Sequence, residues 1–128
     1  MTPDDRSVCD GLWRQLGEPW VEAMAWREDV PRWVSAGRVR LPVHRAPVHL
    51  GALPDWTDAG TVGILLGMAR TAWALPDLTT CAGGERDGSI SWEVESIDPR
   101  DFSGFRQHSR GTTEPEALLR AILAGRAR

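Results

Sequence analysis

The spacing of apolar residues predicts a helix in the middle of the chain. Between residues 58 and 75 one side of a helical wheel is apolar, formed by Val62, Leu65, Leu66, Ala69 and Trp73. Asp58 is the expected N-cap, and Pro76 follows the last turn.

Two glycines, Gly63 and Gly67, lie four residues apart inside this helix. A phosphate-binding loop would place its glycines between a strand and the first turn of a helix. These glycines lie inside the apolar period instead, and each costs about 1 kcal/mol of helix propensity. We therefore expect them to let another backbone pack closely.

A second helix is predicted at the C-terminal end, in the segment TTEPEALLRAILAGRAR. Thr113 and Glu116 have the spacing of a capping box, and Pro115 fits the first turn. Gly125 is expected to end the helix.

Alternating apolar and polar residues predict a small antiparallel sheet. The clearest strand is 89–97, in which Ile90, Trp92 and Val94 alternate with polar residues. Residues 77–82 and 102–110 are expected to form its neighbours, and 38–46 an edge strand. The outer surface is expected to carry acidic side chains opposite a basic row, namely Glu93 and Glu95 opposite Arg106, His108 and Arg110.

The expected architecture is α+β: an antiparallel sheet of three to four strands packed against two main helices. Residues 1–36 are expected to form short helical pieces that carry tryptophans and pack on the rest. Residues 37–128 are expected to form an α/β sandwich domain. At 128 residues the two parts fit one globular unit.

Composition and charge argue against several classes of function. A net charge of −3 argues against a general nucleic-acid binder. All 15 basic residues are arginine, so a Walker A lysine and a lysine Schiff base are excluded. No apolar run approaches a membrane span, and the acidic N-terminus is unlike a signal peptide. We therefore expect a cytoplasmic protein without membrane contact.

Candidate catalytic and metal sites are few. His44 and His49 have no third metal ligand nearby, so no metal or cofactor is expected. Pairs of carboxylates lie at helix starts and turns, where they have structural roles. A hydrolase that uses Cys81 with His108 stays open as an alternative, because catalytic partners meet only in space. The chain is expected to be non-enzymatic.

Seven tryptophans are many for a chain of this size, and Trp and Arg are enriched at binding hot spots. Two interpretations stay open: the N-terminal tryptophans pack inward, or part of the Trp/Arg set faces a partner. The residues expected at such a partner surface are Trp20, Trp26, Arg27, Trp33, Arg38 and Arg40. An alternative anion-binding pocket would use Arg40, His44, Arg45 and Arg86.

Three segments resemble small phage proteins of the phage ABA sandwich type: LPDWTDAGTVGILLGMAR, SISWEVES and TTEPEALLRAILAG, in that order. The resemblance covers residues 53–125 and brings no established catalytic residues. It implies a three-layer fold and a phage or prophage gene expressed inside a bacterium. The polar outer strand face makes a sheet with one open side an equal alternative.

The expected function is that of a phage-encoded accessory protein that binds a host protein, with inhibition of a host defence system as one form. A small-molecule or nucleotide-binding protein and a self-associating structural phage protein are the alternatives.

Overall fold

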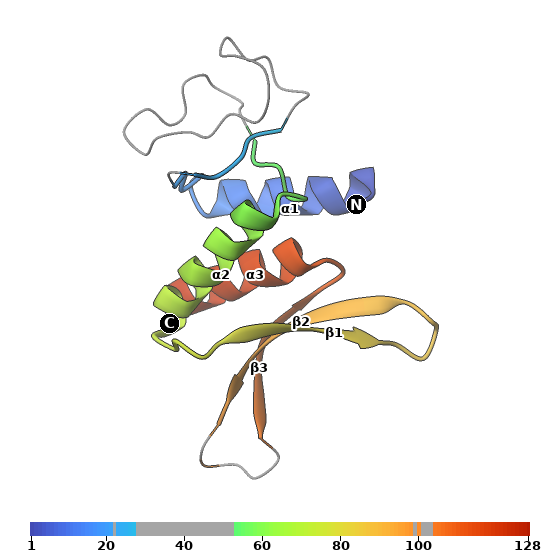
Figure 1. Cartoon of the computed structure of the whole chain (residues 1–128), viewed down its shortest axis with the longest axis vertical. Coiled ribbons are helices and arrows are strands. Elements are labelled where there is room, and N and C mark those ends of the chain that lie inside the picture. Colours follow the sequence, from blue (N-terminus) through green and yellow to red (C-terminus); the bar gives the residue numbers. More distant parts are fainter. Residues whose placement is uncertain (22, 28–52, 99, 101–103) are drawn as a thin grey trace.

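The structure is a computed structural model that describes residues 1–21, 23–27, 53–98, 100 and 104–128. The described part has the predicted α+β architecture, with three helices and one three-stranded antiparallel sheet (Figure 1). The elements are α1 (Pro3–Gln15), α2 (Ala59–Trp73), β1 (Thr79–Gly84), β2 (Ile90–Ile97), β3 (Phe105–Gly111) and α3 (Glu114–Arg126). None of the described helices has the length and apolarity needed to cross a bilayer. The predicted edge strand at 38–46 lies outside the described residues, as does the proposed boundary at 36/37.

The N-terminal segment begins with one continuous helix, where the sequence predicted only short helical pieces. Thr2 and Asp5 form a reciprocal capping box at the start of α1. Leu16 caps the other end, and Gly17 follows with a φ of 82°, a conformation that glycine adopts without steric cost. The helix therefore ends just before Gly17.

The caps of α2 and α3 follow the prediction in most details. Asp58 accepts a hydrogen bond from the backbone N–H of Thr61 (2.9 Å), and Thr113 accepts one from that of Glu116 (3.3 Å). The predicted capping box at α3 is incomplete, because the Glu116 carboxylate accepts a bond from Arg120 instead (3.1 Å).

The prediction that Gly63 and Gly67 allow another backbone to pack closely is wrong. A Cβ atom at Gly63 or Gly67 would meet no atom within 4 Å, so neither glycine mediates close backbone packing. Gly125 lies inside α3 rather than at its end, and there α2 approaches closely. A Cβ atom at Gly125 would lie 2.8 Å from the Cβ of Ala72 and 2.9 Å from the indole of Trp73.

The sheet has the order β1-β2-β3, and its helices lie on one side (Figure 1). On the covered side, α3 packs across the strands and Val94 is fully buried. No described element covers the other side, so the described residues show the alternative with one open face. Leu65, Leu118 and Ile122 join Val94 in a core that continues into the tryptophans of the N-terminal segment.

A bulge opposite Val94 and Glu95 gives β3 one extra residue, His108, because Val94 pairs with Ser109 and Glu95 with Gln107. Glu93 pairs with Arg110 across the strands, as predicted. His108 does not join that outer row; its ring packs on Trp73, with ring centroids 4.4 Å apart. The predicted alternation fails in β3 because the extra residue reverses the facing of Arg106, which pairs with the buried Ser96 and lies beside Trp73.

Substitutions at two glycines test this packing. We expect Gly125→Ala to lower the free energy of unfolding by about 1–3 kcal/mol, since the added methyl group overpacks the contact with α2. Gly67→Ala is the matched control and should raise it by up to about 1 kcal/mol, because only helix propensity changes. Urea denaturation measures both. Equal effects of the two substitutions would contradict the assigned contact.

Candidate functional site

The carboxylate of Asp10 on α1 connects Arg27 with Trp56, which precedes α2. Arg27 donates to both of its oxygens, from Nη1 to Oδ2 (3.2 Å) and from Nη2 to Oδ1 (2.5 Å). The indole N–H of Trp56 also donates to Oδ1 (2.8 Å). The charged pair is largely buried, with side-chain exposures of 14% for Arg27 and 13% for Asp10. This Asp10 network joins three segments that are far apart in the sequence.

Backbone hydrogen bonds reinforce the network. The N–H of Arg27 donates to the carbonyl of Leu53, and the N–H of Asp55 donates to that of Ala25, both at 2.9 Å. Together they form a short antiparallel bridge between Trp26 and Pro54. Residues 23–27 are thereby fixed against the segment that leads into α2.

The predicted partner surface is buried where the structure describes it. Trp20 and Trp26 are only 7% and 1% exposed, and the guanidinium of Arg27 binds Asp10. Trp13 makes edge-to-face contacts with Trp20 and Trp56, with ring centroids 5.5 and 5.7 Å apart. In the structure Trp20 and Trp26 therefore pack inward, the first of the two interpretations that the sequence left open. Trp33, Arg38 and Arg40 lie outside the described residues.

The alternative anion pocket is not assembled in the described part of the chain. Arg40, His44 and Arg45 lie outside it. Arg86 is exposed in the turn between β1 and β2, at the end of the hairpin that projects away from the helices (Figure 1).

The candidate nucleophile and base are not brought together. Cys81 is exposed on β1, where it pairs with Glu93, whereas His108 lies on β3 beyond the intervening strand β2 and packs on Trp73. Cys9 is buried on α1, and burial raises the pKa of its thiol to about 12. Cys9 therefore lacks the environment of an activated nucleophile. Among the described residues, no group of three or more His, Cys, Asp or Glu side chains could hold a metal ion.

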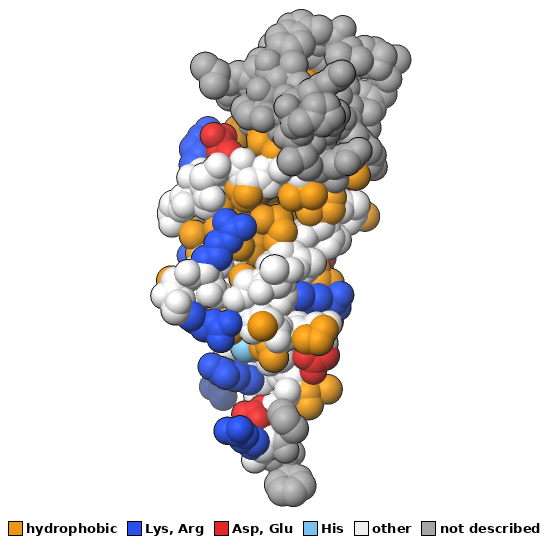
Figure 2. All heavy atoms as spheres, turned by 90° about the vertical axis from the view of Figure 1, so that its left-hand side faces the viewer, with side chains coloured by type: hydrophobic (Ala, Val, Ile, Leu, Met, Phe, Trp, Pro, Cys, Tyr) orange, Lys and Arg blue, Asp and Glu red, His pale blue; other side chains and the backbone are white. Residues whose placement is uncertain are grey.

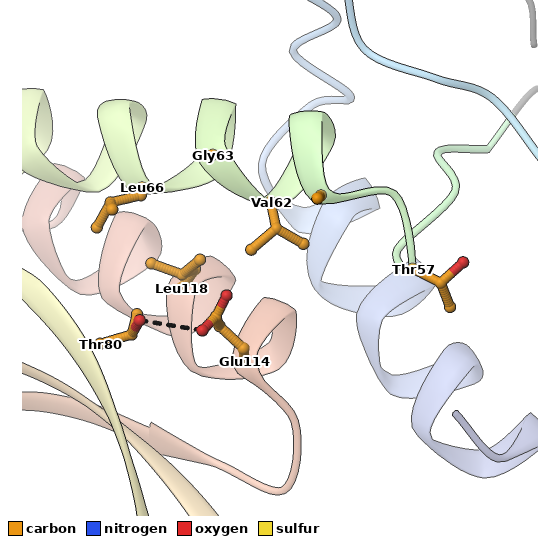
Figure 3. Close-up of a pocket in the computed structure, with 8 residues that line it drawn as sticks. Thr57, Val62, Gly63, Leu66, Thr80, Glu114 and Leu118 are labelled. Atoms are coloured by element: carbon orange, nitrogen blue, oxygen red, sulfur yellow. Dashed lines mark hydrogen bonds between the residues drawn. The ribbon is translucent and has the colours of Figure 1, made fainter.

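A groove of about 370 Å³ lies between α2, α3 and β1 (Figure 3). Val62, Leu66 and Leu118 face one another across it. Its one ionisable side chain is Glu114, which accepts a hydrogen bond from Thr80 (3.0 Å). The groove can accept an apolar group, but the described residues that line it include no nucleophile or general base paired for catalysis.

The open face of the sheet exposes apolar side chains that the sequence reasoning did not single out. Ile97 and Phe105 pair directly across β2 and β3 and are 59% and 64% exposed. We call these two residues the hairpin patch. Glu93 and Glu95 lie on the same face, and burial, with the neighbouring Glu93 carboxyl, raises the pKa of Glu95. The alternation of β2 places Ile97 on the same face as Glu93 and Glu95, whereas the bulge in β3 that turns Phe105 outward could not be predicted from the sequence.

A second feature lies at the C-terminal end of α2, around Trp73. The indole N–H of Trp73 donates to the carbonyl of Ala121 (2.8 Å), which fixes the ring. The guanidinium carbons of Arg128 and Arg106 lie 4.5 and 6.0 Å from the ring centroid. The ring of His108 packs against the same indole at an angle of 57° and bonds through Nε2 to the Ser96 hydroxyl (2.6 Å).

Comparisons with family models, curated proteins and solved structures find no match for the chain. Functional assignment therefore rests on the geometry of these surfaces.

Thiol reactivity tests the assignment of the two cysteines. In the native protein we expect a thiol-specific disulfide reagent at neutral pH to modify Cys81 rapidly and Cys9 only on unfolding, because Cys81 is exposed and Cys9 is buried with a raised pKa. Cys81→Ser should abolish the fast phase. A fast phase that survives this substitution would show that α1 leaves its packed position readily.

Proposed function

We propose that the chain is a non-enzymatic binding protein that acts by protein–protein contact through the open face of its sheet. The observation that carries this proposal is the hairpin patch. A Phe and an Ile side by side on the uncovered side of two strands contribute little to the core, which lies under the helices. Covering each of them fully would contribute about 1.5–3 kcal/mol to binding before the costs of association.

The surroundings of the patch suit a contact with another protein. β3 is an edge strand of the described sheet, so its outer backbone groups can pair with an added strand. Gln107 and Arg110 extend the exposed surface along β3, and the acidic pair of β2 lies beside them. An apolar centre with a polar rim is the usual arrangement of a protein interface.

The biological setting follows from the resemblance to phage ABA sandwich proteins and stays part of the proposal. In that setting the chain is a phage-encoded accessory protein in the cytoplasm of a bacterial host. Its partner is a host protein, for example a component of a defence system, or a second copy of the chain. The Asp10 network favours a contact surface on the sheet over one formed by the tryptophans, because it holds the segments in which Trp20 and Trp26 are buried.

A double substitution in the hairpin patch tests the proposal. We expect Ile97→Thr with Phe105→Thr to weaken capture of the partner from host lysate at least about tenfold, since two apolar anchors are lost. Threonine keeps β propensity, so the melting temperature should change little. The matched control is Ile90→Thr, which alters an equally exposed side chain (61%) at the other end of β2.

Light scattering on the same proteins separates the two kinds of partner. A concentration-dependent dimer that the double substitution abolishes identifies a second copy of the chain. The proposal fails if the double variant captures as much partner as the unchanged chain, or if Ile90→Thr weakens capture equally.

A further inference from the structure

Two arginines from different elements converge on Trp73. Arg106 comes from β3, opposite Ser96 in the sheet, and Arg128 follows α3. Both guanidinium groups lie within 6.0 Å of the centroid of the same indole. Figure 2 shows the face on which arginine side chains gather around the histidine in the lower half of the molecule.

The charges of these arginines are not neutralised by the described residues. No carboxylate in the described part of the chain lies within ion-pair distance of either guanidinium, whereas Arg27, Arg110 and Arg120 each have an acidic partner. Arg128 donates one bond, to the carbonyl of Ala72 (3.2 Å), which leaves most of its five N–H groups for another acceptor.

The histidine beside them reports the local excess of positive charge. Burial lowers the pKa of His108, and the charges of Arg106 and Arg128 lower it further. Its Nε2 atom is held by Ser96, and its Nδ1 atom is buried without a hydrogen-bond partner among the described residues. Arg106 and Arg128 are exposed and their like charges lie around the same indole, so an anion bound between them would relieve their repulsion.

We propose that Arg106 and Arg128, held beside the Trp73 indole and next to His108, form a binding site for a small oxyanion carried as a phosphate group. Guanidinium forks match the oxygens of phosphate, and stacking on an aromatic ring orients them. This oxyanion site differs from the anion pocket predicted from the sequence.

The neighbouring surface limits the size of the ligand. A hollow of about 210 Å³ adjoins Arg106 and is lined by Leu75, Ser96, Ile97, Asp98, Arg100 and Arg106. Arg100 adds a third cation, while Asp98 on the rim would repel a large polyanion. The site therefore suits a single phosphate group better than an extended phosphodiester backbone.

The test follows the ring protons of His108 by NMR while inorganic phosphate is added, with chloride used to keep the ionic strength constant. His108→Gln assigns the resonances. We expect saturable shifts and a rise in the pKa of His108, because the bound anion offsets the two arginine charges that lower it. A parallel titration with adenosine monophosphate distinguishes the source of the phosphate group.

Three arginine variants give the control. Arg106→Gln and Arg128→Gln should each weaken phosphate binding at least about tenfold, since each removes a charged hydrogen-bond donor. Arg86→Gln, an exposed arginine in the β1–β2 turn, should leave it unchanged. The Arg106 side chain makes no hydrogen bond with the described residues, so its variant remains informative if Arg128→Gln lowers the melting temperature.

Each outcome decides the proposal. Equal affinities for the two ligands assign the site to free phosphate, and tighter binding of adenosine monophosphate assigns it to a nucleotide. Shifts that chloride alone reproduces, or that persist unchanged in Arg106→Gln, overturn it. Equal weakening by Arg86→Gln would show general screening of charge and would also overturn it.

Discussion

The described structure depends most on the carboxylate of Asp10. It accepts hydrogen bonds from Arg27 and Trp56, which are 17 and 46 residues away in the sequence. Because the ion pair is largely withdrawn from water, loss of one partner would leave an uncompensated charge, at a cost of about 3–5 kcal/mol. The network holds α1, residues 23–27 and the segment before α2 together. The tryptophans can then pack edge to face over the helices.

This arrangement divides the molecule into a closed part and an open part. The helices and the N-terminal tryptophans share one core, in which Trp13, Trp26 and Leu118 are almost completely buried. The strands contribute one face to that core and leave the other uncovered (Figure 1). Binding surfaces are therefore best sought on the sheet and at its junction with α2, where Phe105 and Arg106 are exposed.

The sequence predicted the elements whose signals are local. Periodicity and caps identified α2 and α3, and alternation identified β2, because each signal depends on residues a few positions apart. The sequence could not show where the tryptophans pack. Arg27 and Trp56 are held by the carboxylate of Asp10, which lies on α1, far from both in the sequence. The sequence also did not show the bulge in β3 opposite Val94, which leaves His108 and Arg106 beside Trp73 and turns Phe105 outward. Close packing was expected at Gly67 but occurs at Gly125, because a glycine signal alone does not reveal which neighbour is near.

A double-mutant cycle on Asp10 and Arg27 tests the central claim most directly. The free energy of unfolding is measured by urea denaturation for Asp10→Ala, Arg27→Ala, the double variant and the unchanged chain. If the pair joins the N-terminal segments to the core, the two substitutions should be non-additive by about 1–3 kcal/mol. Additive effects would show that the two residues act independently, and would contradict the account in which this ion pair keeps the tryptophans inside.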